Sequence, residues 1–112
     1  MPENQPTFPV VDRVIHEPAR LAILTVLSAC ESADFTFLQS ATGLSKGNLS
    51  VQLTRLDEAG LISVERVLDR KTTRTSAALT RRGKQQLGDY WLTMKKIQEH
   101  GAIPGQWAFR SS

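Results

Sequence analysis

Residues 45–62 read SKGNLSVQLTRLDEAGLI. Three leucines in this stretch fall at i, i+4 and i+7, which places them in one narrow apolar stripe of an α-helix. They are Leu49, Leu53 and Leu56. Ser45 is a typical helix N-cap, and Gly60 suits the left-handed position that follows a helix. The pattern therefore predicts a helix over 45–59 with one buried stripe and a polar face opposite it.

The chain before this stretch predicts three further helices. Apolar residues at helical spacing indicate a short first helix over 10–16, and Pro18 suits the first position of a helix over 18–33 that is apolar nearly all round. After a short extended piece at 34–36, Thr36 and Gln39 have capping-box spacing, which predicts a helix start at Thr36. Its core-facing residues are expected to be Phe37, Leu38 and Ala41.

A turn of two residues, Gly43 and Leu44, separates that helix from the one at 45–59. Two short helices joined by a tight glycine-containing turn are typical of a helix-turn-helix. Residues 61–68 are β-branched and roughly alternating, 69–73 are polar, and 74–79 can return as a second strand. Thr80 can cap a last helix over 80–99. We expect a single domain over 10–99, an extended arm over 1–9 and a tail over 100–112.

Positive charge is concentrated in one segment. Residues 66–84 hold seven Lys or Arg and one Asp, a net charge of +6, whereas the rest of the chain carries −3. Such a patch is the expected footprint of a polyanionic partner, although a solvated loop can have the same composition.

Specific residues also resemble a known family. The helix over 45–59 resembles a helix of MarR/ArsR-like winged-helix regulators at both of its ends. The matching residues are Gly47-Asn48-Leu49-Ser50 at its start and Leu56-Asp57-Glu58-Ala59-Gly60-Leu61-Ile62 at and after its end. Leu79-Thr80-Arg81-Arg82-Gly83 resembles the start of the last helix of these regulators. The resemblance covers about residues 14–92 and departs from the family at Thr73, where a proline is common, and at Ala77, where an aromatic residue is frequent. It implies a winged helix-turn-helix: mainly α, with a three-helix core, a two-strand β wing and a long C-terminal dimerisation helix.

Side chains suited to reading DNA lie on the predicted polar face and in the wing at 66–75. Asn48 can pair with adenine, Arg55 with guanine or phosphate, and the Val51 methyls can touch a thymine methyl. Basic wing residues can enter a minor groove or bind phosphates. The candidate DNA-binding residues are Ser45, Lys46, Asn48, Ser50, Val51, Thr54, Arg55, Arg70, Lys71 and Arg74. Asp69 is expected to orient Arg70.

One recognition helix covers only half of a typical operator, so we expect a homodimer that binds two half-sites of double-stranded DNA and acts as a transcriptional repressor. An apolar stripe on the last helix, together with apolar residues of 10–16, is the expected interface. Its residues are Val11, Val14, Ile15, Leu87, Tyr90, Trp91, Met94 and Ile97. The alternative is that these residues pack within one subunit.

Other classes are disfavoured or left open. No nucleotide-binding loop, nucleophile elbow or metal-ligand cluster is evident, so we expect no enzyme activity, cofactor or metal. The single cysteine, Cys30, lies on an apolar helix and is expected to be a core thiol, and the absence of a signal-like N-terminus favours the cytoplasm. Two rival functions remain: a protein-interaction module with an acidic partner, and a switch whose unknown effector sits near Trp91 and Trp107.

Overall fold

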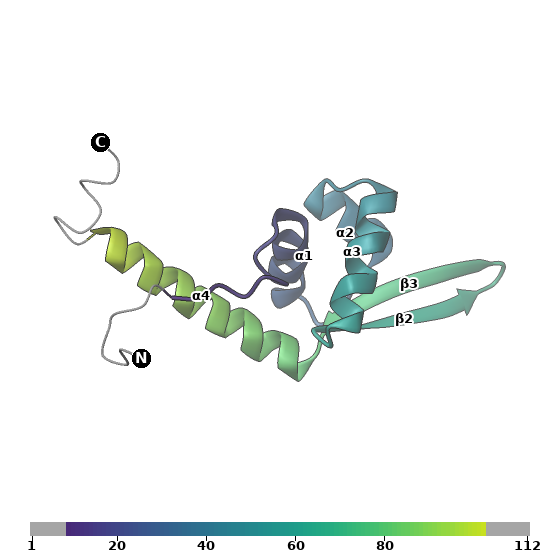
Figure 1. Cartoon of the computed structure of the whole chain (residues 1–112). Coiled ribbons are helices and arrows are strands. Elements are labelled where there is room, and N and C mark those ends of the chain that lie inside the picture. The colour runs from purple at the N-terminus through teal and green to yellow at the C-terminus, as the bar shows by residue number, and fades with distance from the viewer. Residues whose placement is uncertain (1–8, 103–112) are drawn as a thin grey trace.

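The computed structural model describes residues 9–102. Within that range the elements are α1 (Pro18–Ser28), β1 (Ala33–Asp34), α2 (Phe35–Thr42), α3 (Lys46–Glu58), β2 (Ile62–Asp69), β3 (Thr72–Leu79) and α4 (Arg81–Ala102). The first three helices cluster together, the β2–β3 hairpin projects to one side and α4 to the other (Figure 1). This is the predicted architecture, mainly α with a small β wing. Most of the arm and the tail, with Trp107, lie outside the described residues.

The sheet has one strand more than predicted. β1 pairs with β3, and β3 pairs with β2, so three antiparallel strands lie in the order β1-β3-β2. Ala33 stands opposite Ala77, which in turn stands opposite Val64. Ala77 is 2% exposed, so a small side chain fills the place where the related family often has an aromatic one. The short β1 fixes the base of the wing against the helices.

The predicted helix over 10–16 is wrong. Residues 13–15 form a turn in which Asp12 Oδ1 accepts hydrogen bonds from the backbone N–H of Val14 (2.9 Å) and of Ile15 (3.3 Å). An aspartate that bonds the nearby backbone in this way competes with helix formation. α1 also ends earlier than expected, at Ser28, with Pro18 in its first turn as predicted.

The N-cap of α2 lies two residues before the predicted one. Asp34 is the N-cap, and its Oδ1 accepts a hydrogen bond from the backbone N–H of Phe37 at 2.7 Å. The buried face therefore consists of Leu38 with half-buried neighbours, whereas Phe37 is 52% exposed. The predictions that Phe37 and Ala41 face the core, and that Thr36 caps the helix, are wrong. Gly43 ends α2 at φ +75°, in the left-handed region, as predicted.

The core lies where α1, α2 and α3 meet the base of the sheet and the first turns of α4. Its members have little or no exposed surface and come from every element described except the wing tip. They include Ile15, Ile23, Leu24, Leu27, Leu38, Leu49, Leu53, Leu56, Leu61, Ile62, Leu87 and Tyr90. The leucine stripe predicted for α3 is thus confirmed as buried.

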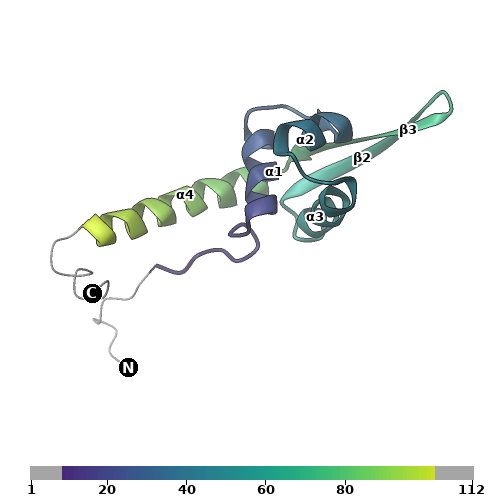
Figure 2. The same cartoon turned by 90° about the horizontal axis from the view of Figure 1, so that it is seen from above.

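Close packing fixes the start of α4. Thr80 Oγ1 accepts a hydrogen bond from the N–H of Gly83 at 2.9 Å and donates one to the carbonyl of Gly60 at 2.7 Å. The N–H of Thr80 donates to the carbonyl of Leu61 at 3.1 Å. A Cβ on Gly83 would lie 1.9 Å from that Leu61 oxygen, so only glycine allows α4 to approach this closely. These contacts set the direction in which α4 leaves the domain (Figure 2).

Candidate nucleic-acid interface

α3 presents a polar face to solvent. Ser45 caps the helix, with its Oγ accepting a hydrogen bond from the N–H of Asn48 at 3.1 Å. The stripe of leucines turns inward, so the exposed face carries the remaining side chains. They include the predicted residues Lys46, Asn48, Ser50, Val51, Thr54 and Arg55, all of them exposed. Two acidic residues at the C-terminal end of α3, Asp57 and Glu58, are exposed as well. Val51 is 47% exposed and gives this face one apolar spot.

Three of these polar groups are already engaged within the protein. Asn48 Oδ1 accepts a hydrogen bond from Gln52 Nε2 at 3.0 Å. Thr54 Oγ1 donates to the backbone carbonyl of Ser50 at 3.1 Å, which leaves its lone pairs for an incoming donor. Ser45 Oγ accepts within the cap and keeps its own proton to donate, as a phosphate oxygen requires.

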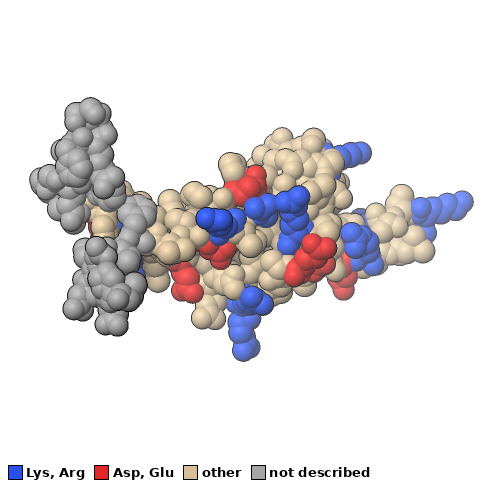
Figure 3. Space-filling model, viewed as in Figure 1, with Lys and Arg blue, Asp and Glu red and all other residues tan. Residues whose placement is uncertain are grey.

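The wing is a long two-stranded ribbon with a basic tip. β2 and β3 pair from Ile62–Leu79 at the base to Asp69–Thr72 at the tip, so the turn consists of Arg70 and Lys71 alone. The predicted turn over 69–73 is therefore too long. Arg70 sits at φ 61°, an uncommon conformation for a residue other than glycine. In Figure 3, Lys and Arg side chains stand at the wing tip, with acidic side chains further back toward the helices.

Asp69 pairs with Arg74, not with Arg70 as expected from sequence. Asp69 Oδ2 lies 3.6 Å from Arg74 Nη2, and both side chains are more than half exposed. An ion pair this exposed contributes little to stability and breaks readily when another anion approaches. Arg74 is therefore available to a phosphate, which can replace Asp69 at little cost.

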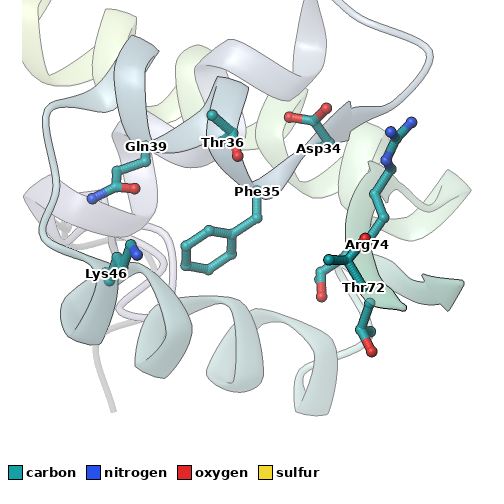
Figure 4. A pocket seen from close by; sticks show the side chains of 9 residues that line it. Asp34, Phe35, Thr36, Gln39, Lys46, Thr72 and Arg74 are labelled. Carbon is teal, nitrogen blue, oxygen red and sulfur yellow. The ribbon is translucent and has the colours of Figure 1, made fainter. Parts of the chain in front are cut away.

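A cleft of about 520 Å³ lies between the helices and the wing. Lys46 of α3 stands at one side and Arg74 of β3 at the other, with the ring of Phe35 between them (Figure 4). Hydroxyl groups line it from two elements, Thr36 of α2 and Thr72, Thr73 and Thr75 of β3. The carboxylate of Asp34 and the amide of Gln39 complete the lining. Cations at both sides with hydroxyls between them suit a phosphate chain.

Sequence analysis missed these threonines. Their number in the wing was visible, but their position over α2 depends on the pairing of β1 with β3. A second cleft continues along α3 between Ser50, Thr54 and Arg66, and it shares Phe35 and Thr75 with the first. The two clefts therefore adjoin at Phe35 and Thr75, between the polar face of α3 and the wing, and the second is also lined by Leu53, Asp57 and Val64.

Comparison with known proteins identifies the family. Residues 19–98 match the family described as "Winged helix DNA-binding domain". The chain belongs to that family. A transcriptional regulator homologue from Pyrococcus horikoshii has the same fold, with a TM-score of 0.75 and 23% identity over 82% of this chain and 91% of that one.

Two other solved structures share the winged-helix fold. A MarR family transcriptional regulator from Silicibacter pomeroyi has a TM-score of 0.57 and 23% identity, covering 84% of this chain and 62% of that one. The transcriptional repressor CouR bound to a 23-mer DNA duplex has a TM-score of 0.68 and 22% identity, covering 88% of this chain and 70% of that one. The winged-helix fold that the resemblance to MarR/ArsR-like regulators implied is confirmed.

The residues expected at a dimer interface fall into three groups in this winged-helix protein. Ile15, Leu87 and Tyr90 are at most 5% exposed and already covered within one subunit, and Tyr90 Oη lies 2.8 Å from His16 Nδ1. Val14 is 38% and Trp91 48% exposed. The remaining members, Val11, Met94 and Ile97, are half-buried. Leu92, which the sequence analysis omitted, is 60% exposed beside Trp91.

Residues 9–102 hold neither a metal-ligand cluster nor a membrane-spanning helix. No three His, Cys, Asp or Glu side chains there are grouped as a metal site would need. Over the same range, each helix is too short or too polar to cross a membrane. Cys30 is a half-buried free thiol just past α1.

Proposed function

We propose that this winged-helix protein is a homodimeric transcriptional repressor that binds double-stranded DNA in the cytoplasm. The observation that carries the proposal is the division of α3 into two faces. Every large apolar side chain of α3 except Val51 is buried, and the opposite face offers amide, hydroxyl and guanidinium groups. A helix of this kind fits the major groove, where those groups can meet base edges.

The wing and the cleft supply the contacts to the DNA backbone. With α3 in the major groove, the phosphate chain at the groove edge lies in the cleft between Lys46 and Arg74. The tip residues Arg70 and Lys71 then lie along the adjacent minor groove, whose negative potential attracts arginine. Ser45 and Lys46 stand at the N-terminus of α3, where the helix dipole favours a phosphate.

Dimerisation places two copies of α3 on one face of the duplex. The outer half of α4 projects beyond α1–α3 in both views of the chain (Figures 1 and 2). Trp91 and Leu92 of α4, and Val14 before α1, have exposed apolar side chains that a second copy can cover. Related two-fold dimers bind half-sites about one helical turn apart, roughly 34 Å.

Fluorescence anisotropy with labelled duplex from the region upstream of the protein's own gene tests the proposal. Six phosphate contacts in the dimer predict a log-log salt slope of roughly −5, with affinity that survives unlabelled competitor DNA. Arg70→Ala/Arg74→Ala should weaken binding to every sequence and flatten the slope. An affinity that is absent even at low salt would contradict the proposal and favour a protein-interaction module. Repression itself is tested with a reporter fused to the bound region.

A further inference from the structure

A chain of side-chain hydrogen bonds runs from α1 to the polar face of α3. Arg20 Nη1 donates to Gln52 Oε1 at 2.9 Å, and Gln52 Nε2 donates to Asn48 Oδ1 at 3.0 Å. Arg20 is itself held from behind, because its Nε donates to the carbonyl of Val14 and its Nη2 to that of Arg13. The chain connects a residue near the core to a side chain on the proposed DNA-reading face.

The chemistry of arginine fixes the polarity of every bond in this chain. A guanidinium has only donors, so the Gln52 side chain must face Arg20 with its oxygen. Its NH₂ group then faces Asn48 and donates to it, so the accepting atom of Asn48 must be Oδ1. The two amides could each be turned by 180° if considered alone, but the donors of Arg20 permit one arrangement only.

We infer that Arg20 and Gln52 are positioning residues that orient the Asn48 amide so that α3 presents an N–H donor to the base edge. The inference rests on the proposed function and adds a specificity to it. One lone pair of Asn48 Oδ1 is taken by Gln52, whereas Asn48 Nδ2 has no internal partner among the hydrogen bonds of the described residues. The donor should therefore favour a base with an acceptor in the major groove, such as N7 or O6 of guanine or O4 of thymine, over cytosine.

A substitution that reverses the polarity gives the sharpest test. In Gln52→Glu, the carboxylate accepts from Arg20 with one oxygen and from Asn48 with the other, so Asn48 must turn and present Oδ1 instead of Nδ2. Base preference at one position per half-site should then change toward cytosine, whose major-groove edge offers the N4 donor and no acceptor. Adenine carries both the N7 acceptor and the N6 donor, so it does not distinguish the two states. We expect the ratio of affinities for the two base classes to change by about tenfold or more. Sequencing of duplexes selected from a randomised library measures it.

Three further variants separate positioning from structure and from charge. Arg20→Met should relax the preference at that same position, and Arg20→Lys, which keeps a donor, should restore part of it. Gln98→Glu adds the same charge on the exposed surface of α4 and should leave base preference unchanged. Thermal melting of each variant records any loss of stability, which an exclusively structural role of Arg20 would cause without changing the preferred base.

The outcomes distinguish this inference from the function on which it rests. If the wild-type protein binds no DNA, the proposed function fails and the inference fails with it. If the wild-type protein selects a sequence but Gln52→Glu lowers affinity for all bases equally, the orienting role is wrong and the DNA-binding function stands. If Gln52→Glu changes the preferred base at one position only, and Asn48→Ala loses the preference at that same position, the result supports both the proposed function and the orienting role.

Discussion

α3 and α4 each have a glycine in the first turn, and the two glycines have opposite surroundings. A Cβ on Gly83 of α4 would lie 1.9 Å from the Leu61 carbonyl oxygen, inside the protein. A Cβ on Gly47 of α3 would meet no atom within 4 Å, because the residue faces solvent. The first glycine is required by the fold. The second weakens a helix and has no structural reason in the isolated subunit.

The apolar stripes of the two helices differ in the same sense. The apolar stripe of α3 is entirely buried in the core, with Leu49 and Leu56 at 0% exposure. The stripe of α4 is buried at Leu87 and Tyr90 but ends in exposed Trp91 and Leu92. The polar side chains that α3 exposes suit a polyanion, whereas Trp91 and Leu92, which stand exposed among polar residues of α4, suit contact with protein. The predictions below test that contrast.

Gly83→Ala should have the largest effect, on stability. The added methyl must displace either α4 or the Leu61 backbone, and overpacking of this kind costs about 3 kcal/mol. For a domain of this size the melting temperature should fall by roughly 15 °C at fixed protein concentration. Gly88→Ala in the same helix is the matched control, since its Cβ would meet nothing within 4 Å. Equal melting temperatures for the two variants would contradict the close approach.

Trp91→Ala/Leu92→Ala should act on assembly. If this surface joins two subunits, loss of its largest side chains costs about 2 kcal/mol or more, which weakens the dimer by roughly 30-fold. Sedimentation velocity over a dilution series measures the dissociation constant. Gln85→Ala, an exposed change near the start of the same helix, should have no effect. A dimer unchanged by the double substitution would mean that the interface lies elsewhere.

The features predicted correctly from the sequence are those that depend on residues close together in the chain. The leucine stripe, the Ser45 cap and the Thr80 cap were predicted correctly, because each arises from neighbours within one or two helical turns. Residues 10–16 failed because a seven-residue apolar pattern is too short to nucleate a helix against the competing carboxylate of Asp12. In α2, the true cap at Asp34 changed which residues face inward.

Features of the interface that depend on distant pairing could not be predicted. The Asp69–Arg74 ion pair follows from strand register, which brings Arg74 opposite Val67 and its neighbours. The threonine-lined cleft requires β1 to pair with β3, and the Arg20–Gln52 bond joins residues 32 positions apart. Composition indicated a basic wing, but the side chains that hold its cations in place became evident only in three dimensions.

Arg74→Ala should affect DNA affinity through its salt dependence. The dimer loses two phosphate contacts, so the log-log salt slope should become less steep by about two units. The ratio of wild-type affinity to Arg74→Ala affinity for DNA should accordingly fall by roughly tenfold between 50 and 200 mM salt. Lys96→Ala, an exposed cation on α4 away from the wing, is the control. A slope that changes equally in both variants would mean that net charge, and not the wing, controls binding.

Gly47→Ala should have the smallest effect and is the most direct test of the contrast between the two helices. Replacing an exposed helical glycine by alanine should stabilise the subunit by about 0.5 kcal/mol, as Gly88→Ala also should. If phosphate approaches the backbone N–H groups at the start of α3, the new methyl stands in its path, and affinity for DNA should fall severalfold. Gly88→Ala should gain the same stability and keep its affinity. If both variants bind DNA as the wild type does, DNA does not fill the open space around Gly47. The side of α3 that contacts the groove would then be one that does not include Gly47.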